Sequence, residues 1–455
     1  MDSLPPRRWL VRGVVALLVV SLFAPAVTAG VGYLTTTSDP TNLRASVESP
    51  ANGTTVVSIQ GFHFRGYAND RKPARLVAVG PKGTVQWVHD GTGFDATWFY
   101  DVDPLENGNL LVTSTAKGST LVYELDPQTG ERVWTQRLPI HDTHDVDLIN
   151  GDQLLVANMR VPNKGDRLFI YDMGDDEVVW RWQFDEHFPT SGGGGAGDWT
   201  HVNDVDKIGE GRYLVSPRNF DQVIVVDRST KEITMRLGSD DDHDVLYEQH
   251  NPQYLESESG NPTILVADSE NDRVVEYARR NGTWTRTWTL SGGLNWPRDA
   301  DRLPNGNTLV VDTMYQRVVE VTPKGEVVWE FYAPWAPYAV ERTAYGDEAG
   351  GPTMADLNVT GNYSVHGSAG IAPTAEKRTV SFWVVETFSG TPLENAADEF
   401  ARRWSHVTPW IRPVWMGSWD FLYALVGLGI LVGWSVGELV YQRDRIRRTV
   451  GRYVR

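Results

Sequence analysis

The chain has 455 residues, 41% of them hydrophobic, which is enough for a large buried core. It contains no cysteine, which excludes disulfides and thiolate metal sites. A formal net charge of −17 argues against nucleic acid as a partner, because phosphate binding requires a basic surface. The acidic residues are spread along the chain, a composition that suits high salt and indicates a halophilic source. Plentiful Gly, Pro and Trp favour many short strands over long helices.

The N-terminal end differs from the rest of the chain. Residues 11–31 form an apolar stretch that is preceded by Arg7 and Arg8. Small residues near Ala29 offer a site for a signal peptidase. Residues 1–34 are therefore predicted to be either a cleaved signal or an uncleaved transmembrane anchor.

Two kinds of unit then alternate along the chain. One is a β-branched run, a polar turn and a second run that usually ends in Trp, as in ARLVAVGPKGTVQWV (74–88) and DRLFIYDMGDDEVVW (166–180). The other is a short strand, a turn and an apolar strand, as in DVDLINGDQLLVAN (145–158) and DVDKIGEGRYLVSP (204–217). Each kind occurs six times. One unit of each kind together supplies four strands, so the six pairs predict an all-β fold, a six-bladed β-propeller.

The order of the units predicts how the ring closes. The first unit is an outer hairpin (74–88), and the last is a degenerate inner pair, GSAGIAPTAEKRTVSFWVVE (367–386). We expect these two hairpins to form one blade, which would close the ring and remove its sheet edges. Residues 332–365 would then be an insertion before the last inner strand.

The C-terminal end again suggests a membrane. Residues 411–440 include an apolar stretch of about the 20 residues that a spanning helix needs. Residues 441–455 are rich in arginine, and basic segments stay in the cytoplasm. We therefore predict a transmembrane segment near each terminus, both termini cytoplasmic, an extracellular propeller over 35–410, and membrane lipid as a partner.

Aligning the six inner strands on a shared apolar residue predicts a ring of side chains. The first strand of each propeller blade lines the central channel, so equivalent positions surround one axis. Five residues before the shared apolar position stand Tyr100, His144, Asn203, His250, Arg298 and His366. Side chains alternate along a strand, so the residues two positions earlier should face the same way. Those residues are Trp98, Asp142, His201, Glu248, Trp296 and Ser364.

These rings predict a cationic pocket with an aromatic rim. The strand after His201 would bring Arg218 to the same mouth. Such a pocket suits an anion that carries an aromatic group. Two other interpretations are open: the histidine and Asp-Val-Asp motifs could be structural hydrogen-bonding groups, or the histidines and carboxylates could hold a metal, although the arginines would repel a cation.

Two stretches resemble one known family. HVNDVDKIGEGRYLVSPRN (201–219) and QHNPQYLESESGNPTILVADSENDRVVEY (249–277) resemble repeats of the arylsulfate sulfotransferases, which are six-bladed propellers. The resemblance covers about residues 70–335. It implies that His250 is a nucleophile that forms a sulfohistidine, that His201 and Arg218 bind the sulfate, and that His144 is a further pocket histidine.

The resemblance implies an enzyme that moves a sulfuryl group from an aryl sulfate to a phenol, without a cofactor or a metal. His144 is then the candidate base, and Arg298, Asn203, Tyr100, Trp98, Trp296 and His366 are candidates for substrate binding. Imidazole suits this role as a covalent nucleophile, and fixed cations suit the sulfuryl oxygens. The alternative is a non-catalytic propeller that binds a partner or a glycan at the cell surface.

Overall fold

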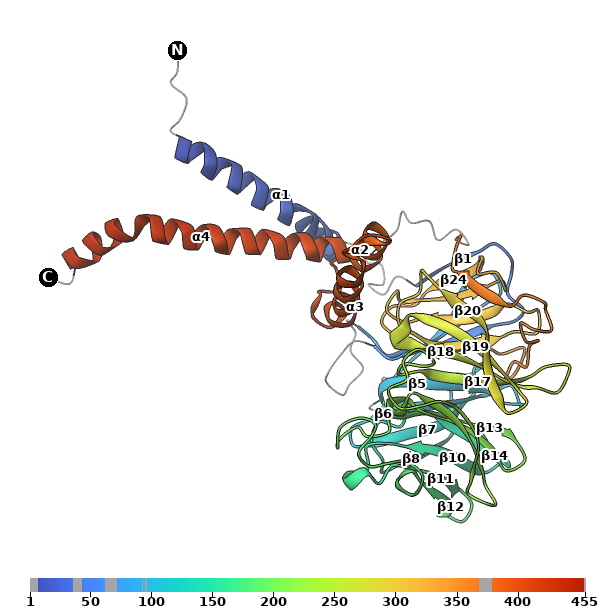
Figure 1. Cartoon of the computed structure of the whole chain (residues 1–455). Coiled ribbons are helices and arrows are strands. Elements are labelled where there is room, and N and C mark those ends of the chain that lie inside the picture. The colour runs from blue at the N-terminus through green and yellow to red at the C-terminus, as the bar shows by residue number, and fades with distance from the viewer. Residues whose placement is uncertain are drawn as a thin grey trace. The chain divides into compact units, whose positions relative to one another are not determined.

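The computed structural model describes residues 7–35, 43–61, 72–91, 93–94, 96–367 and 379–453. The chain divides into two compact units. One unit, Met1–Pro40 with Pro373–Arg455, is helical, and the other, Thr41–Ala372, consists of β-sheets (Figure 1).

The β unit is a six-bladed propeller, which confirms the predicted fold class. Each blade is an antiparallel sheet of four strands, and one strand of each sheet contacts its counterparts in neighbouring blades around the channel. These inner strands are β5 (Ala96–Pro104), β9 (Val146–Ile149), β13 (Val202–Gly209), β17 (His250–Glu256), β21 (Pro297–Arg302) and β25 (Pro337–Arg342).

The other strands of each blade follow outward in chain order. Outside β5 lie β6 (Leu110–Ala116), β7 (Ser119–Leu125) and β8 (Arg132–Leu138). Outside β9 lie β10 (Gln153–Asn158), β11 (Arg167–Asp172) and β12 (Glu177–Gln183). Outside β13 lie β14 (Arg212–Pro217), β15 (Gln222–Asp227) and β16 (Ile233–Gly238). Outside β17 lie β18 (Pro262–Asp268), β19 (Arg273–Arg280) and β20 (Thr283–Ser291). Outside β21 lie β22 (Thr308–Asp312), β23 (Arg317–Val321) and β24 (Val327–Tyr332).

The closing blade is built differently from the prediction. Its order is β25, β2 (Thr55–Ile59), β3 (Arg75–Val79) and β4 (Val85–Asp90), so the N-terminal part supplies three strands and the later part supplies one. The predicted second strand pair at 367–386 is wrong: residues 380–386 are helical, and residues 368–378 lie outside the described part. The segment 332–365, predicted as an insertion, contains the true inner strand. Its sequence PYAVER lacks both the Asp-x-Asp motif of four other blades and the spacing to a shared apolar residue, which explains why the alignment missed it.

Two short strands extend the blades beyond four strands. β1 (Arg44–Val47) pairs antiparallel with β24, and β26 (Gly361–Ser364) pairs parallel with β20. Four 3-10 turns complete the β unit: η1 (Pro162–Lys164), η2 (Phe184–Glu186), η3 (Arg218–Phe220) and η4 (Ser269–Asn271).

Burial follows the position of a strand within its blade. The middle strands are buried on both faces, and β6 and β7 have no exposed position, as expected for β-branched runs between two neighbouring blades. The outer strand β4 instead alternates between half-buried and exposed residues. The hydrophobic core therefore lies between blades, as in the cluster that joins Trp182 and Trp199.

Tryptophans at the ends of the outer strands connect neighbouring blades. The indole Nε1 of Trp182 donates a hydrogen bond to the carbonyl oxygen of Lys231 at 2.9 Å, and Trp288 donates to Pro323 at the same distance. Both acceptors lie in a turn of the following blade. These two tryptophans thus bury an apolar ring and satisfy their polar atom in the next blade.

The helical unit contains α1 (Arg7–Thr35), α2 (Val380–Phe388), α3 (Glu394–Ile411) and α4 (Ser418–Tyr453). The helices Arg7–Thr35 and Ser418–Arg443 are long and apolar enough to cross a membrane. They run antiparallel: the guanidinium of Arg12 contacts the carboxylate of Glu438 at 2.7 and 2.9 Å, and Phe23 packs on Gly427. The range 35–410, predicted as propeller, also holds α2 and α3, and α4 continues into the predicted tail.

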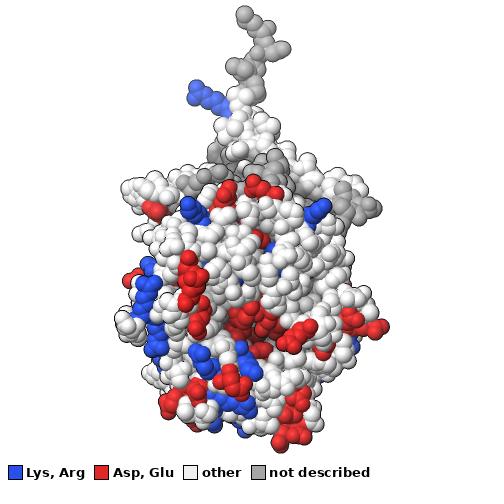
Figure 2. Space-filling model, turned by 90° about the vertical axis from the view of Figure 1, so that its right-hand side faces the viewer, with Lys and Arg blue, Asp and Glu red and all other residues white. Residues whose placement is uncertain are grey.

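Charge is unevenly distributed over the surface. On the face shown in Figure 2, Asp and Glu side chains gather near the middle, beside a smaller group of Lys and Arg. The net charge of −17 therefore coexists with local basic regions.

Candidate functional site

Five of the six predicted ring residues meet at one end of the channel. They are Tyr100, in the middle of β5, and His144, Asn203, His250 and Arg298, near the start of an inner strand, each at most 8% exposed. The sixth position is occupied by Tyr338, on β25, which is 1% exposed. The repeat alignment therefore located the ring correctly in every blade that carries its motif.

The placement of His366 in this ring is wrong. His366 is exposed and makes an isolated bridge with Glu326 at the edge of an outer hairpin. Its Nδ1 lies 2.9 Å from the carbonyl oxygen of Ser364. The error follows from the misassigned closing blade, because the sixth inner strand is β25 and not a strand near residue 367.

Local backbone irregularities turn the site residues toward the channel. In five blades the pairing of the inner strand shifts register at the ring residue, for example between His250 and Gln253. Such a bulge re-aims side chains, so that the ring residue and its successor can both face the channel. The residue two positions before the ring residue has left-handed backbone in five blades: Asp142 (φ 56°), His201 (44°), Glu248 (45°), Trp296 (54°) and Ala336 (59°). A left-handed turn, rather than strand alternation, therefore aims His201.

The hydrogen bonds of His250 fix which ring nitrogen is free. Its Nδ1 lies 2.8 Å from Ser269 Oγ and 3.1 Å from the carbonyl oxygen of Glu248. The Ser269 hydroxyl lies 2.6 Å from the carbonyl oxygen of Pro297, to which it donates. Ser269 must then accept from Nδ1–H, and the Glu248 carbonyl can only accept. His250 is thus protonated on Nδ1 and has an unprotonated Nε2, which hydrogen-bonds to no described side chain.

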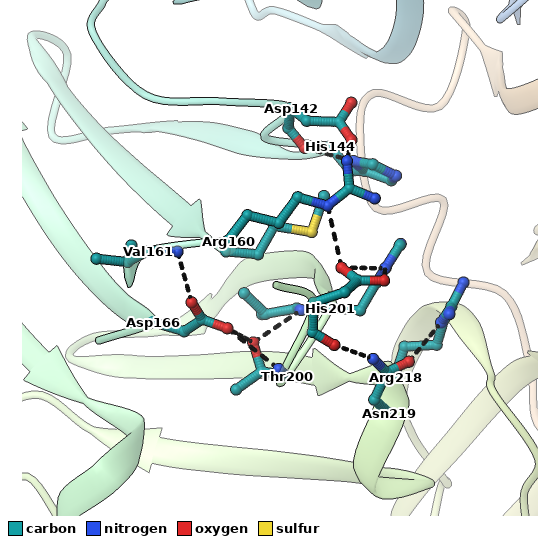
Figure 3. A network of polar contacts seen from close by, with 12 residues as sticks. Asp142, His144, Arg160, Val161, Asp166, Thr200, His201, Arg218 and Asn219 are labelled. Atoms are coloured by element: carbon teal, nitrogen blue, oxygen red, sulfur yellow. Dashed lines mark hydrogen bonds and ion pairs between the residues drawn. The ribbon is translucent and has the colours of Figure 1, made fainter. Parts of the chain in front are cut away.

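His144 and His201 are each held in place through their own Nδ1. Nδ1 of His144 donates to the carbonyl oxygen of Asp142 at 2.7 Å, and Nδ1 of His201 contacts the Asp198 carboxylate at 2.8 and 2.9 Å. In Figure 3 the Arg160 side chain lies between Asp142 and His201. It pairs with the carboxylates of Asp142 and Asp198 and so joins both histidines in one network. Nε2 of neither imidazole hydrogen-bonds to a residue in the described part of the chain.

Two arginines supply positive charge beside these imidazoles. Arg298 is 8% exposed and donates to Gln60 Oε1 at 2.7 Å, and no described carboxylate forms an ion pair with it. Its guanidinium lies 4.0 Å from the centre of the Trp296 ring and 4.8 Å from that of Tyr338. Arg218 is held by Asn219 Oδ1 at 3.0 Å and by Glu248 Oε2 at 3.2 Å. A buried arginine without a carboxylate is a typical feature of an anion site.

Aromatic rings form the walls between these polar groups. Tyr100 stacks on His144 at 3.8 Å and donates its hydroxyl to Asp142 Oδ1 at 2.7 Å. Trp98 lies against the edge of Tyr100, and Trp296 lies 5.8 Å from His250. Asn203 is fully buried; its Nδ2 donates to the carbonyl of Gln249, and its Oδ1 has no partner among the described residues. Flat surfaces and hydrogen-bonding atoms thus face one space.

Electrostatics keep the three imidazoles uncharged. Burial, followed by the charges of Arg298 and Arg218, lowers the pKa of His250 well below its ordinary value. Burial and His201 do the same to the pKa of His144. The pKa of His201 falls to about 3 because burial and Arg218 outweigh its contact with Asp198. Burial also lowers the pKa of Arg298 to about 10, which leaves it charged at neutral pH.

Sequence reasoning missed several groups that shape this site. Tyr338 was hidden by the atypical last strand, and Ser269 lies in the ADSEND segment (267–272), where no pattern signals a contact with His250. Arg160 and Asp198 lie in connections between strands. Asp198 lies in the glycine-rich stretch 190–199, where no sequence pattern signals a contact with His201. The proximity of these groups is a tertiary effect that repeats do not encode.

One comparison with known proteins identifies a family. Residues 48–287, more than half of the chain, match the family described as arylsulfotransferase (ASST). No curated protein matches the chain.

Many solved structures share the propeller at low identity. A protein of unknown function from Bacteroides caccae is 12% identical, with 64% of this chain and 98% of that chain covered and a TM-score of 0.42. A chain of a nidogen/laminin complex is 13% identical over 63% and 97%, with a TM-score of 0.43. Catalytically inactive virginiamycin B lyase from Staphylococcus aureus is 8% identical over 64% and 89%, with a TM-score of 0.39. These similarities are too distant to carry an argument about function.

The hydrogen bonds and burial of the three histidines predict their protonation. We expect neutral, Nδ1-protonated rings for His144, His201 and His250 down to about pH 5.5, because a lowered pKa extends the neutral form to lower pH. Nitrogen NMR of histidine-labelled protein would test this, with single His→Ala variants used to assign the signals. An imidazolium signal from any of the three rings at that pH would contradict the assignment.

Proposed function

The chain belongs to the arylsulfotransferase family, and we propose that it transfers a sulfuryl group from an aryl sulfate to a phenol through a covalent intermediate on His250. One observation carries the proposal above all others: His250 is buried and protonated on Nδ1, its Nε2 hydrogen-bonds to no described side chain, and Arg218 and Arg298 lie close enough to lower its pKa. An uncharged imidazole is a competent nucleophile, and a covalent intermediate divides one difficult transfer into two easier ones.

In the first proposed step Nε2 of His250 attacks the sulfur of the aryl sulfate. The N–S bond forms, the bond between sulfur and the aryl oxygen breaks, and the aryl oxide leaves with the electron pair. Charge on the sulfuryl oxygens grows in the transition state, and fixed cations stabilise it. Arg218 and Arg298 fit this role, because both lie close enough to lower the pKa of His250.

His201 and His144 are proposed to play different roles because their partners differ. His201 is hydrogen-bonded to a carboxylate, so an arriving sulfate anion would favour its protonation and let Nε2–H donate to a sulfuryl oxygen. His144 is hydrogen-bonded to a backbone carbonyl and fits the base. In the second step it would take the phenol proton as the phenol oxygen attacks sulfur and the N–S bond breaks. That proton can protonate the next leaving aryl oxide.

The walls support an aromatic donor and acceptor. Trp98, Trp296 and Tyr100 offer flat surfaces on which aryl groups can pack. The free amide oxygen of Asn203 can accept the hydroxyl of a bound phenol. Aryl sulfate and phenol are also the substrates that the family implies.

The first test compares two identical substitutions. His250→Ala should reduce transfer from 4-nitrophenyl sulfate to phenol by more than about a thousandfold, because it removes the nucleophile. His366→Ala should retain activity, because that histidine is exposed and lies outside the ring. Both variants would be measured in the full-length protein, with mass spectrometry of quenched wild-type protein to find a sulfated peptide that contains residue 250.

The outcomes separate the proposed function from its alternative. Transfer by His250→Ala at the wild-type rate would remove His250 as nucleophile. No transfer by the wild type with any phenol would favour the non-catalytic propeller at the cell surface, with the histidines as recognition groups.

Ser269 is proposed as a positioning residue that acts through His250. Ser269→Ala removes one of the two acceptors that fix Nδ1–H, and the Glu248 carbonyl remains. We expect kcat to fall about tenfold, which corresponds to the loss of one ordinary hydrogen bond, with KM nearly unchanged. Ser269→Thr should restore most of the rate, whereas an equal loss in both variants, or a change in KM alone, would contradict this role.

We also propose that α1 and α4 both span the membrane, with the propeller outside and both termini in the cytoplasm. The salt bridge between Arg12 and Glu438 places the arginine-rich ends of both helices on the same side. Cleavage of residues 1–34 as a signal would leave Glu438 without this partner near an apolar span, which favours an uncleaved anchor over a signal. In this arrangement residues 411–440 contain the second transmembrane helix, and the basic tail 441–455 lies in the cytoplasm.

Protease treatment of intact cells tests the topology. We expect external protease to digest the propeller and spare a tag placed after residue 455, and N-terminal sequencing to find residues 1–34 retained. A protected propeller, a digested tag or a mature protein that begins near Ala29 would contradict the arrangement.

A further inference from the structure

A second cluster of polar residues lies farther along the inner strands than the histidine ring. The Asp-x-Asp motifs of four blades place two carboxylates per strand at equivalent positions, immediately after the ring residue. They are Asp101 and Asp103, Asp145 and Asp147, Asp204 and Asp206, and Asp299 and Asp301. In the closing blade Glu341 takes the second position, and Glu348 and Asp347 come from the connection that follows β25.

These side chains line a cavity that is separate from the histidine cluster. Seven of the motif aspartates, Glu341, Asp347 and Glu348 line it, and none of its lining residues is Lys, Arg or His. Its volume is about 40 Å³ for the centres of water-sized spheres, compared with roughly 10–15 Å³ for one water molecule. The cavity is therefore large enough for an ion together with some of its water.

Structural hydrogen bonds account for only some of these carboxylates. Asp145 accepts from the backbone N–H of Val205, and Asp299 accepts from that of Val340 at 2.7 Å, so both connect neighbouring blades. Asp204 and Asp301 are different: they are 6% and 8% exposed, and Oδ2 of each has no hydrogen-bond partner among the described residues. A buried carboxylate oxygen without a partner is costly and requires another explanation.

The charge of the lining points in the same direction. Carboxylates gathered this closely repel one another, and no Lys, Arg or His lies among the lining residues. A cation would offset this repulsion, because it replaces the missing positive charge and the missing hydrogen bonds together.

We infer that this cavity binds a hard divalent cation of the calcium class, with Asp145, Asp204 and Asp206 as its first ligands. One carboxylate oxygen from each of the three lies within 4.8 Å of the others. Oxygens bound to one calcium ion at about 2.4 Å can be at most about 4.8 Å apart, so the three can share an ion. An all-oxygen set with further carboxylates nearby suits calcium, whereas zinc and copper prefer imidazole or thiolate.

The cation would connect two neighbouring blades at the channel. Asp145 immediately precedes β9, whereas Asp204 and Asp206 lie on β13. Binding would therefore stabilise the packing of these blades without contacting the groups assigned to sulfuryl transfer. The two proposals can fail independently, because stability and transfer are measured separately.

The test uses the full-length protein in detergent after treatment with a chelator. Calcium chloride should raise the melting temperature by several degrees and bind with a measurable heat, while the same concentration of magnesium should do less. Absence of both the thermal shift and the heat of binding would overturn the inference.

Two variants locate the site. Asp204→Asn/Asp206→Asn should abolish the response to calcium and, in chelator, melt no lower than wild type, because it removes like charges. Asp185→Asn/Glu186→Gln changes charge equally on an exposed turn and should respond like wild type. If the first double variant fails to fold, Asp206→Asn alone should bind calcium at least tenfold more weakly. An undiminished response in the foldable variant would overturn the assignment.

Discussion

The pairing of β25 with β2 is the interaction on which the rest of the propeller depends. It joins Val340 to Val57, residues from opposite ends of the β unit, and turns an open array of blades into a ring. Without it both terminal blades would expose a strand edge. It also delivers Tyr338, whose ring lies 5.0 Å from Tyr100, 5.5 Å from His144 and 6.1 Å from His250. The strand that closes the ring therefore also completes the wall of the histidine site.

The closed channel has two polar layers that differ in the type of side chain they hold. The inner strands supply consecutive residues, such as His144 and Asp145 or Arg298 and Asp299, to different layers. One layer holds uncharged imidazoles with arginines, and the other holds carboxylates. The bulges at the ring residues permit this arrangement, because regular strands would send consecutive side chains to opposite faces. The channel thus presents imidazoles and arginines at one layer and carboxylates at the next, although the two layers come from consecutive residues of the same strands.

The sequence was sufficient to predict the fold class because each blade repeats the same pattern. A shared apolar position aligned five inner strands, four of which also carry the Asp-x-Asp motif, so the sequence alone located Tyr100, His144, Asn203, His250 and Arg298. The sixth strand, PYAVER, obeys the same geometry with other residues, which is why Tyr338 was missed and His366 was misplaced. Contacts between connections, such as Ser269 with His250, depend on tertiary packing and leave no periodic trace.

The left-handed residues before the ring have a consequence for how this channel can diversify. His201, Glu248 and Trp296 each occupy a single turn that precedes the regular pairing of its inner strand. A side chain can therefore be exchanged at such a position without shifting the register that holds the blade in place. The conformation itself disfavours β-branched residues, because a branched Cβ crowds the backbone at positive φ. Five of the six blades thus carry one such position at the mouth of the channel, and its side chain can vary while the ring residues stay in place.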